Sequence, residues 1–371
     1  MNVQITTAKL SDGRDIIYFD DSEHTAGERV LEDSRGLPET QAMSEIRRDP
    51  LTGDWVAYAA HRMNRTFMPP ANENPLAPTK PGQLPTEIPS PTYDVVVFEN
   101  RFPSFSMNIH VPEDWAPTVD GIDLYPRKPA LARCEVVCFT EDPALSFKDL
   151  PVSRIRTVIE AWAHRTAALS ALPGIKQVFP FENRGEEIGV TLQHPHGQIY
   201  SYPFLSPRLA AIVKQAQQHE KEHGGEIFEA ILTAEKAAGT RIIAETQHFT
   251  VFVPAAAKWP LEAVVMPNRH VADFTELDEA EKQELAELLK RLYGAVDKFF
   301  PGIDRTPYIA GWTQAPVDKQ LRRYGRLHLQ LFSLMRSPNR MKFLAGSESA
   351  QGVWINDTTP ERIAARFKEI W

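Results

Sequence analysis

The stretch His194-Pro195-His196-Gly197-Gln198-Ile199-Tyr200 places two imidazoles and a neutral amide at alternate positions. On an extended segment, alternate side chains project from the same face of the strand. His194, His196 and Gln198 are therefore expected to share one face. Such a face suits the capture of a phosphate ester by one imidazole, with neighbours that hold its proton and the phosphoryl oxygens.

The three side chains are expected to have different tasks. Because an imidazole with a pKa near 6.5 is largely neutral at pH 7, it attacks phosphorus without a separate strong base, and His196 is the predicted nucleophile. A backbone carbonyl beside His194 is the expected acceptor for its second ring nitrogen, since Pro195 stiffens the approach. The Gln198 amide can bind phosphoryl oxygens but cannot act as an acid, which favours transfer over hydrolysis. Gly197 is predicted to let a phosphate approach the main chain.

The composition indicates a folded protein of two ordinary domains, with 371 residues, 42% of them apolar and 9% aromatic. A formal charge of -8 leaves no broad cationic surface for nucleic acid. Cys134 and Cys138 are expected to be reduced, because four residues of strand separate them by roughly 13 Å, beyond the ~7 Å limit for a disulfide. With neither a signal peptide nor a membrane span in the sequence, the cytoplasm is the expected location.

A repeated order of elements indicates an α+β fold built from two tandem units, each a mainly antiparallel sheet with helices packed on it. Strand, strand, helix, strand and histidine-bearing strand recur at a separation of about 130 residues. Asp149 is expected to cap the first helix, and Thr275 with Asp278 is expected to open the second. The corresponding strands are predicted at 93–98, 133–139, 178–181 and 194–200, and at 249–254, 262–267, 308–312 and 326–332.

The predicted boundaries are an N-terminal extension at 1–45, a catalytic half at 46–206 and a C-terminal half at 207–371. The extension is polar and acidic, and regular patterning is expected to start near Arg47. Eight of the 30 prolines lie between Pro69 and Pro91, which predicts an extended loop with few ladder hydrogen bonds. The C-terminal half keeps one histidine, His328, where the first half has two, so we expect the chemistry in the first half.

Other candidate site residues leave two interpretations open. Arg62 and Arg65 suit nucleotide phosphates or are surface charges, and Asn100 suits a ribose or forms a turn. His270 and His328 either share a metal with Gln330, although two histidines and an amide make a small ligand set, or they are buried, hydrogen-bonded groups. Lys342 and Glu348 flank a glycine turn that suits a sugar phosphate, or they form a solvated ion pair.

The sequence resembles the galactose-1-phosphate uridylyltransferases of the histidine-triad superfamily from about Arg47 to the C-terminus. The resemblance rests on short blocks of sequence: Arg48-Asp49-Pro50-Leu51-Thr52-Gly53-Asp54-Trp55, His61-Arg62, Phe181-Glu182-Asn183, His194-Pro195-His196-Gly197-Gln198, Pro267 to His270, Lys342-Phe343 and Gly346 to Glu348. It implies ping-pong transfer of UMP from UDP-glucose to galactose 1-phosphate, through a covalent intermediate on His196.

The same resemblance implies roles for further residues. Asn183, Thr191 and Gln198 match positions that hold the uridylyl phosphate, and Arg62, Arg65 and Asn100 match the nucleotide pocket. Lys342 and Glu348 match a hexose site that the partner subunit completes, which implies a homodimer with shared active sites. Arg101 and Ser347 replace an acidic and an aromatic residue of some relatives, so the acceptor hexose and the nucleotide stay open.

The resemblance also implies that the family's metal sites are reduced in this chain. Many relatives bind zinc through a Cys-x-x-Cys pair in the loop that here reads Asn74-Pro75-Leu76-Ala77, together with a histidine upstream of the cysteine strand and the first histidine of the triad motif. Of those four ligands only His194 is kept. His270 and His328 match a second site, in which Gln330 replaces a histidine. We therefore expect that no cofactor is required, although residual zinc is compatible with the remnants His194, His270 and His328.

Two alternative functions stay open at this point. A phosphorylase of the same architecture would cleave a nucleotide sugar or a dinucleoside polyphosphate with inorganic phosphate as the acceptor. A nucleotide sensor would bind the same ligands in a pocket whose His196 never reacts. An adduct formed with UDP-glucose alone would exclude the sensor, and release of a nucleoside diphosphate on addition of phosphate would indicate the phosphorylase.

Overall fold

The computed structural model describes residues 3–21, 29–39, 41–64, 69–70 and 73–371. Within them, eleven strands form one sheet in the order β1-β2-β5-β7-β9-β8-β13-β14-β12-β11-β10, and every pairing in it is antiparallel. Its strands are β1 Gln4–Lys9, β2 Asp15–Asp20, β5 Val95–Glu99, β7 Cys134–Cys138, β8 Gln177–Arg184, β9 His196–Tyr202, β10 Ile242–Glu245, β11 Phe249–Phe252, β12 Leu261–Pro267, β13 Tyr308–Thr313 and β14 His328–Ser333. The predicted α+β fold with mainly antiparallel strands is confirmed.

Smaller sheets and the helices complete the structure. A three-stranded sheet has the order β4-β3-β6, and β15 pairs with β16. The bounds of these strands are β3 Glu45–Arg48, β4 Trp55–Tyr58, β6 Arg127–Pro129, β15 Met335–Ser337 and β16 Arg340–Met341. The helices are α1 Val152–Ser170, α2 Pro207–His223, α3 Ile227–Ala238, α4 Glu279–Lys298, α5 Gly346–Gln351 and α6 Pro360–Ile370.

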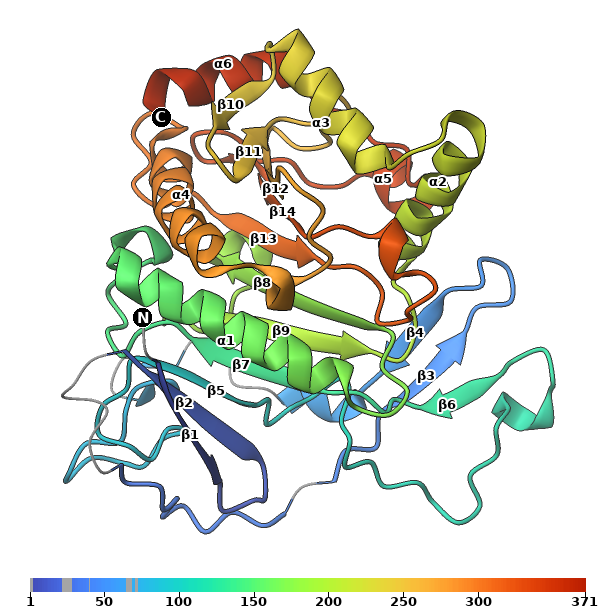
Figure 1. The fold of residues 1–371 in the computed structure, drawn as a ribbon. Helices are drawn as coiled ribbons and strands as arrows, with labels where there is room; N and C mark the ends of the chain where they lie inside the picture. The colour runs from blue at the N-terminus through green and yellow to red at the C-terminus, as the bar shows by residue number, and fades with distance from the viewer. Residues whose placement is uncertain (1–2, 22–28, 40, 65–68, 71–72) are drawn as a thin grey trace.

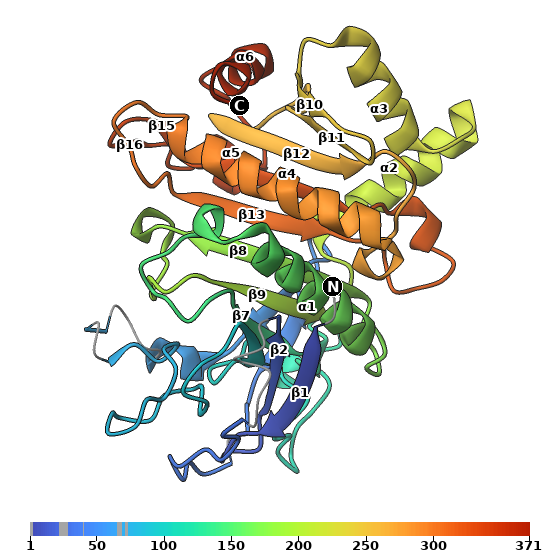
Figure 2. The same cartoon turned by 60° about the vertical axis from the view of Figure 1, so that its left-hand side comes forward.

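Helices α1 and α4 lie side by side on one face of the large sheet (Figures 1 and 2). Each presents an apolar stripe to the sheet at helical spacing, which is why these segments are helices. The side chains on those stripes are buried: Ile155, Val158, Ile159 and Trp162 of α1, and Leu285, Leu288, Leu289 and Leu292 of α4. Asp278, and not Thr275, is the N-terminal cap of α4, and its carboxylate accepts from the Glu281 backbone N–H in a capping box. Thr275 lies in the preceding 3₁₀ helix Phe274–Glu276.

The predicted cap of α1 is wrong. Pro151 is the N-terminal cap residue of that helix and makes no side-chain capping bond. Asp149 instead ends the short 3₁₀ helix Phe147–Asp149, and its carboxylate accepts from the backbone N–H and the hydroxyl of Ser146. A carboxylate can satisfy the preceding turn as readily as the following helix, and the sequence spacing does not separate these two choices.

The opposite face of the sheet is covered differently in the two halves. Over the N-terminal half, Leu76, Ile88 and Tyr93 of the proline-rich region pack on Val136 and Cys138 of β7. Over the C-terminal half, α2 and α3 cover the sheet, with side chains that include Phe228 and Leu232. The described part of the proline-rich stretch contributes no strand, in agreement with the predicted loop.

The halves repeat the same strand order and join edge to edge. In the N-terminal half the order is β5-β7-β9-β8, and in the C-terminal half the mirrored order is β13-β14-β12-β11. Strands β8 and β13, which precede the histidine strands along the chain, pair at the centre. There the Tyr308 hydroxyl donates to Glu182 at 2.7 Å, and Arg184 pairs with Asp297. The two units therefore share one continuous sheet.

The N-terminal segment is more regular than its composition predicts. We expected regular structure to start near Arg47, but β1 and β2 form a hairpin that pairs with β5 and extends the large sheet. Ile16, Ile17, Tyr18 and Phe19 on β2 are all buried. The strand was not predicted because both of its faces are covered, so it lacks the alternation of apolar and polar residues that marks a half-exposed strand.

Both cysteines are free and buried at the two ends of β7, as expected from their spacing. Burial raises the pKa of the Cys134 thiol to about 12. No helix in the described residues is both long enough and apolar enough to cross a membrane.

The expectation for Gly197 is wrong. A Cβ at this position would lie 2.8 Å from a ring atom of Phe139 and 2.8 Å from the Phe181 carbonyl oxygen. Phe139 belongs to the helix-covered core on one side of β9, whereas His196 and Gln198 project from the other side. Gly197 is therefore required by core packing and does not face a bound phosphate.

We expect Gly197→Ala and Gly294→Ala to change stability in opposite directions. The added methyl of Gly197→Ala overlaps the aromatic core, at a cost of about 1–3 kcal/mol. Gly294 lies inside α4 and a Cβ there meets nothing within 4 Å, so alanine should stabilise the helix by about 1 kcal/mol. Urea unfolding of both variants measures the changes, and a neutral Gly197→Ala would contradict the packing assigned here.

Candidate active site

His196 begins β9, between β7 and β8, with its ring on the face opposite α1. Its Nδ1 lies 2.7 Å from the His194 carbonyl oxygen, so Nδ1 carries the proton and donates it to that carbonyl. The lone pair is then on Nε2. Burial lowers the pKa of His196, while the bond to the His194 carbonyl opposes this change. The hydrogen bond expected from the sequence is present, and it leaves a neutral imidazole with a free nucleophilic nitrogen.

His194 is held by a buried set of hydrogen bonds. Its Nε2 lies 2.7 Å from the Thr140 carbonyl oxygen and 2.8 Å from the Tyr93 hydroxyl, and Asn74 Nδ2 lies 2.9 Å from its Nδ1. The Asn74 amide can donate to Nδ1 only if that nitrogen is unprotonated. Burial lowers the pKa of His194 to about 4, which agrees with a neutral ring. His194 therefore ties the proline-rich loop to the nucleophile's strand.

Two cavities meet at His196. One has a volume of about 250 Å³ and is lined by Asn183, Arg184, Arg305 and both histidines of the motif, among others. The other, of about 180 Å³, is lined by Glu87, Arg101, Gln198 and His196, among others. Because His196 lines both cavities, its free nitrogen can meet a ligand that extends into each of them.

The structure brings together most of the side chains predicted for the nucleotide. Arg62, Asn100, Thr191 and Gln198 line the smaller cavity with His196, and Asn183 lines the larger one. Gln198 faces the same side of β9 as His196, and its amide has no hydrogen-bond partner within the described residues. It is therefore available to a ligand.

Arg62 and Asn100 also have structural partners. An Arg62 guanidinium N–H donates to the Phe102 carbonyl at 2.5 Å. Asn100 Oδ1 accepts from the Phe102 N–H at 2.8 Å, so Asn100 forms a turn as well as lining the cavity. Both interpretations that the sequence left open for Asn100 are thus compatible with its position.

Two of the predicted residues are not brought to this site, and a third cannot be placed. Arg65 lies outside the described residues. Lys342 and Glu348 line neither cavity; they pair with each other at 3.1 Å, and both are buried. They therefore do not form the solvated ion pair that was one alternative for them. Both residues lie in the C-terminal half. Within one chain, this ion pair is therefore not at the cavities that His196 lines.

The C-terminal half contains a closed counterpart of the catalytic strand. His328 Nδ1 donates to the Arg326 carbonyl at 2.8 Å, which repeats the bond between His196 and His194. His328 is only 5% exposed, and the Phe228 ring of α3 lies 6.0 Å from it. Gln330 donates to Glu262 at 2.6 Å. Helix α3 therefore covers His328.

The histidines that were expected to be remnants of metal sites are hydrogen-bonded to other groups of the protein. Both ring nitrogens of His194 have hydrogen-bond partners, as described above. His270 Nδ1 donates to Glu226 Oε1 at 2.9 Å, and the same oxygen accepts from the buried Arg326 guanidinium at 3.4 Å. A guanidinium at this carboxylate opposes binding of a cation. In the described residues, no three His, Cys, Asp or Glu side chains are placed to share a metal ion.

Some functional residues had no signal in the sequence. Tyr93 and Thr140 hold His194 from distant segments, and Asn74, noted only as part of a loop without cysteines, is its third partner. Glu87 lines the smaller cavity. None of these residues lies at a motif spacing, because the contacts depend on how β5, β7 and the loop come together. A polar residue in an otherwise apolar or proline-rich run was the only available hint.

Family models match both halves of the chain. Residues 35–206 match "Galactose-1-phosphate uridyl transferase, N-terminal domain", and residues 212–371 match the C-terminal domain of the same name. A galactose-1-phosphate uridylyltransferase from Streptomyces lividans is 39% identical over 98% of this chain and 97% of the relative. A Thermotoga maritima protein of the same name is 33% identical over 88% of this chain and 98% of the relative.

Solved structures share the architecture. A uridylyltransferase structure superposes with a TM-score of 0.76 at 32% identity, over 88% of this chain and 98% of the other. An ADP-glucose phosphorylase from Arabidopsis thaliana superposes with a TM-score of 0.65 at 21% identity, over 88% of this chain and 99% of the other. The second similarity concerns the fold alone.

We expect the protein to lose stability as the pH falls from 6.5 to 5. Burial lowers the pKa values of His194 and His328 to about 4 in the folded state, whereas in the unfolded chain they stay near 6.5. The unfolded chain therefore binds protons in this window that the folded chain does not. Each histidine should cost about 2 kcal/mol of unfolding free energy between pH 6.5 and 5. Urea unfolding across this range measures the loss.

The variant His194→Gln serves as the matched comparison. It lacks the titrating imidazole, so its unfolding free energy should fall less steeply with acidification than that of the wild type. An identical pH slope in the two proteins would contradict a neutral, buried His194.

Proposed function

Because the chain belongs to the galactose-1-phosphate uridylyltransferase family, we propose that His196 carries out its reaction through a covalent UMP-histidine intermediate. The enzyme is a nucleotidyltransferase that moves UMP from UDP-glucose to galactose 1-phosphate, giving UDP-galactose and glucose 1-phosphate. Its substrates are therefore nucleotide sugars and hexose phosphates.

The observation that carries the mechanism is the 2.7 Å bond from His196 Nδ1 to the His194 carbonyl. It directs the Nε2 lone pair away from the strand and stabilises the positive charge that the ring acquires on forming a bond to phosphorus. The same bond fixes the ring plane, so the reacting nitrogen is oriented before a substrate arrives.

The reaction proceeds in two balanced steps. His196 Nε2 attacks the α-phosphorus of UDP-glucose, the bond from this phosphorus to the bridging oxygen breaks, and glucose 1-phosphate leaves with the electron pair. A phosphate oxygen of galactose 1-phosphate then attacks the same phosphorus, and the P–N bond breaks to restore neutral His196. Neither leaving group needs a proton at neutral pH, which is consistent with an amide, Gln198, as the neighbour of the nucleophile.

The other side chains of the two cavities bind and orient the substrate in this proposal. Gln198 and Thr191 donate to the phosphoryl oxygens, and Arg62 adds a positive charge near them. Asn183 lies on the strand next to His196 and donates from the side of the larger cavity. None of these four groups is a base that could activate water, which favours an intermediate that persists until a hexose phosphate arrives.

A phosphorylase is the second candidate, because the fold is shared with a plant ADP-glucose phosphorylase. In that reaction inorganic phosphate would take the place of the hexose phosphate as the acceptor. The names of the full-length relatives favour the uridylyltransferase. Both reactions use the same first step, so the acceptor distinguishes them. A nucleotide sensor would show neither step.

We also propose that the enzyme works without a bound metal. The loop that faces His194 is held by Asn74, Tyr93 and the Thr140 carbonyl through hydrogen bonds. Near His270, the Arg326 guanidinium already provides a positive charge at Glu226. These contacts supply the crosslink and the charge that a structural cation would otherwise contribute.

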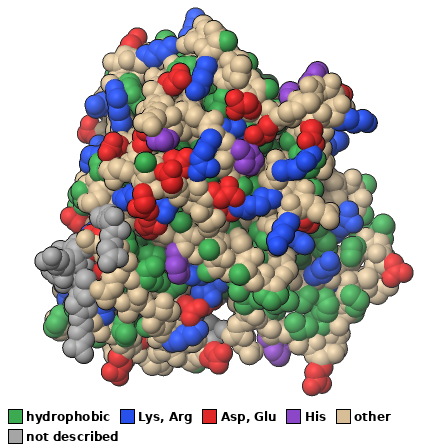
Figure 3. Space-filling model, in the orientation of Figure 1, with side chains coloured by type: hydrophobic (Ala, Val, Ile, Leu, Met, Phe, Trp, Pro, Cys, Tyr) green, Lys and Arg blue, Asp and Glu red, His purple; other side chains and the backbone are tan. Residues whose placement is uncertain are grey.

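Two exposed apolar surfaces support a homodimer with shared active sites. One lies on the small sheet and its loops, where hydrophobic side chains gather at the lower right of Figure 3, and includes Leu51, Val56, Tyr58 and Leu124. The other lies beside the Lys342–Glu348 pair, where Phe343 is 80% exposed and Val353 and Ile355 are also exposed. In this proposal the segment 342–355 enters the active site of a second copy, which fits the separation of these residues from His196 within one chain.

The buried free thiols are suited to a reducing compartment. Cys134 and Cys138 lie in the packed centre of the sheet, and oxidation of either one would introduce polar atoms there. We therefore place the reaction in the cytoplasm, where thiols stay reduced.

Incubation with UDP-glucose alone should add one uridylyl group to the intact mass, located at His196. The adduct should form equally well in protein treated with EDTA, since no step uses a metal. His196→Gly should abolish the adduct, because among the described residues His196 alone brings a free nucleophilic nitrogen to both cavities. Gln198→Ala should slow adduct formation by about one to two orders of magnitude. Intact-mass spectrometry with timed quenching measures all four results.

The same labelled protein distinguishes the candidate functions. Galactose 1-phosphate should discharge the adduct and yield UDP-galactose, whereas discharge by inorganic phosphate into UDP would indicate the phosphorylase. Absence of any adduct in the wild type would sink the covalent mechanism, and EDTA sensitivity would sink the proposal of metal independence.

Coexpression of His196→Gly with Lys342→Met should restore activity that neither variant has alone. In a shared-site dimer, the mixed species carries one intact site, with His196 from one chain and Lys342 from the other. Random pairing should give roughly a quarter of the wild-type activity. Steady-state assays of the copurified mixture, with thermal melting as a check of folding, measure this. A mixture that is as inactive as each variant alone would contradict the shared site.

A further inference from the structure

Glu87 is the only carboxylate that lines the smaller cavity at His196, among the residues that the structure describes. Its side chain is 9% exposed, and it lies in the proline-rich loop across from Gln198. A bound nucleotide brings negative phosphates to this cavity, which a carboxylate repels. Glu87 must therefore face a part of the ligand that donates hydrogen bonds.

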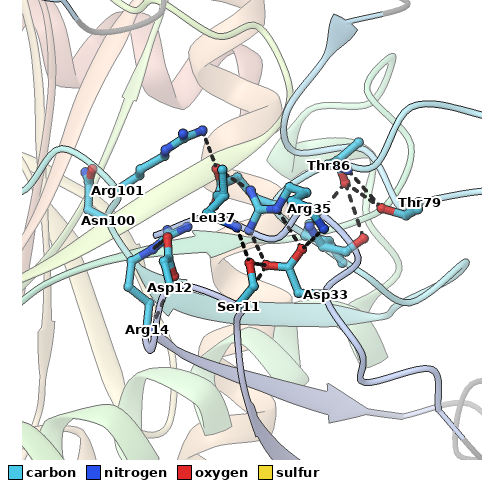
Figure 4. Close-up of polar contacts among 12 residues, drawn as sticks. Ser11, Asp12, Arg14, Asp33, Arg35, Leu37, Thr79, Thr86, Asn100 and Arg101 are labelled. Atoms are coloured by element: carbon cyan, nitrogen blue, oxygen red, sulfur yellow. Dashed lines mark hydrogen bonds and ion pairs between the residues drawn. The ribbon is translucent and has the colours of Figure 1, made fainter. Parts of the chain in front are cut away.

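Two arginines from the N-terminal segment hold Glu87 in place. Arg14, in the turn between β1 and β2, donates to Glu87 Oε2 at 2.6 Å and to the Glu99 carbonyl at 2.8 Å. Arg35 contacts Glu87 Oε1 at 2.7 Å. Figure 4 shows Arg14 and Arg35 approaching the same point, with Arg101 and Asn100 of the cavity wall beside them. The carboxylate is thus oriented from two sides.

Each of these arginines also has a carboxylate partner of its own. Asp12 accepts from Arg14 Nε at 2.8 Å, and Asp33 accepts from Arg35 through both of its oxygens at 2.8 Å. Two guanidinium charges are therefore shared among three carboxylates. Arg101, at 3.6 Å from Glu87 Oε1, is a more distant partner and is 40% exposed.

Glu87 consequently keeps capacity to accept further hydrogen bonds. A carboxylate offers about four acceptor positions, and Arg14 and Arg35 use one on each oxygen. One position on each oxygen remains for a ligand. Two adjacent acceptors match two adjacent hydroxyl groups, and a carboxylate in a nucleotide site is well suited to the hydroxyls of a ribose.

We propose that Glu87 recognises the ribose hydroxyls of the nucleotide, and that Arg14 and Arg35 are positioning residues that aim it. This inference rests on the proposed function, because it assumes a nucleotide in the cavity with His196. It assigns a task to the N-terminal segment, whose first 34 residues precede the region matched by the family models. The hairpin β1–β2 extends the sheet and also supports one wall of the substrate cavity.

The test measures binding of UDP and of 2′-deoxy-UDP by titration calorimetry, which requires no chemical step. Wild-type protein should bind UDP on the order of tenfold more tightly than 2′-deoxy-UDP, because a hydrogen bond to a charged acceptor is lost. In Glu87→Gln this preference should fall to about twofold, chiefly through weaker binding of UDP. Arg14→Lys and Arg35→Lys should reduce the preference although neither touches the ligand.

Glu245→Gln is the matched control, because Glu245 is an exposed carboxylate of the C-terminal half paired with Lys236. Its preference for UDP should equal that of the wild type. If Glu87→Gln weakens both nucleotides by the same factor, Glu87 only supports the loop and the inference is wrong. Failure of the wild type to bind UDP would overturn it as well. Normal UDP binding without a His196 adduct would refute the transfer mechanism and leave the assignment of Glu87 standing.

Discussion

The pairing of β9 with β7 on one side and β8 on the other is the constraint on which the site depends. A strand hydrogen-bonded along both edges cannot rotate, so its side chains alternate strictly between two faces. One face must pack beneath α1, where Phe139 leaves room only for Gly197. The other face then carries His196 and Gln198 into open cavities. His196 therefore lies on a rigid strand, and the surrounding segments are arranged around that strand.

The two halves show how one architecture yields one open and one closed site. In both, a histidine Nδ1 donates to the carbonyl two residues earlier. Over His196 the covering layer is a proline-rich loop that leaves cavities, whereas over His328 it is a helix that places Phe228 against the ring. Because a packed helix excludes ligands, the half with the loop is the one that offers space for a substrate beside its histidine. A covering loop must be anchored. Asn74, Tyr93 and Glu87 anchor this one through polar partners that are distant in the sequence.

Much of the site was predictable from residue types and spacing. The alternation in the histidine motif correctly predicted the shared face and the carbonyl that orients His196, since both follow from the local geometry of a strand. The helices α1 and α4 were predictable from their apolar stripes. The predictions that were wrong, for Asp149, Gly197 and the start of regular structure, concern residues whose partners come from elsewhere in the chain. A glycine forced by a core phenylalanine and one that faces a ligand look identical in sequence.

The sequence by itself determined the orientation of the His196 ring, its tautomer and the α+β class, because these depend on contacts within a few residues. Only the tertiary structure decided that the two units share one sheet through β8 and β13, that Lys342 and Glu348 lie apart from His196, and that Arg14 and Arg35 reach Glu87. Each of these outcomes joins segments separated by dozens of residues. Their free energy arises from burial and pairing that exist only once the chain has folded, so no local pattern records them.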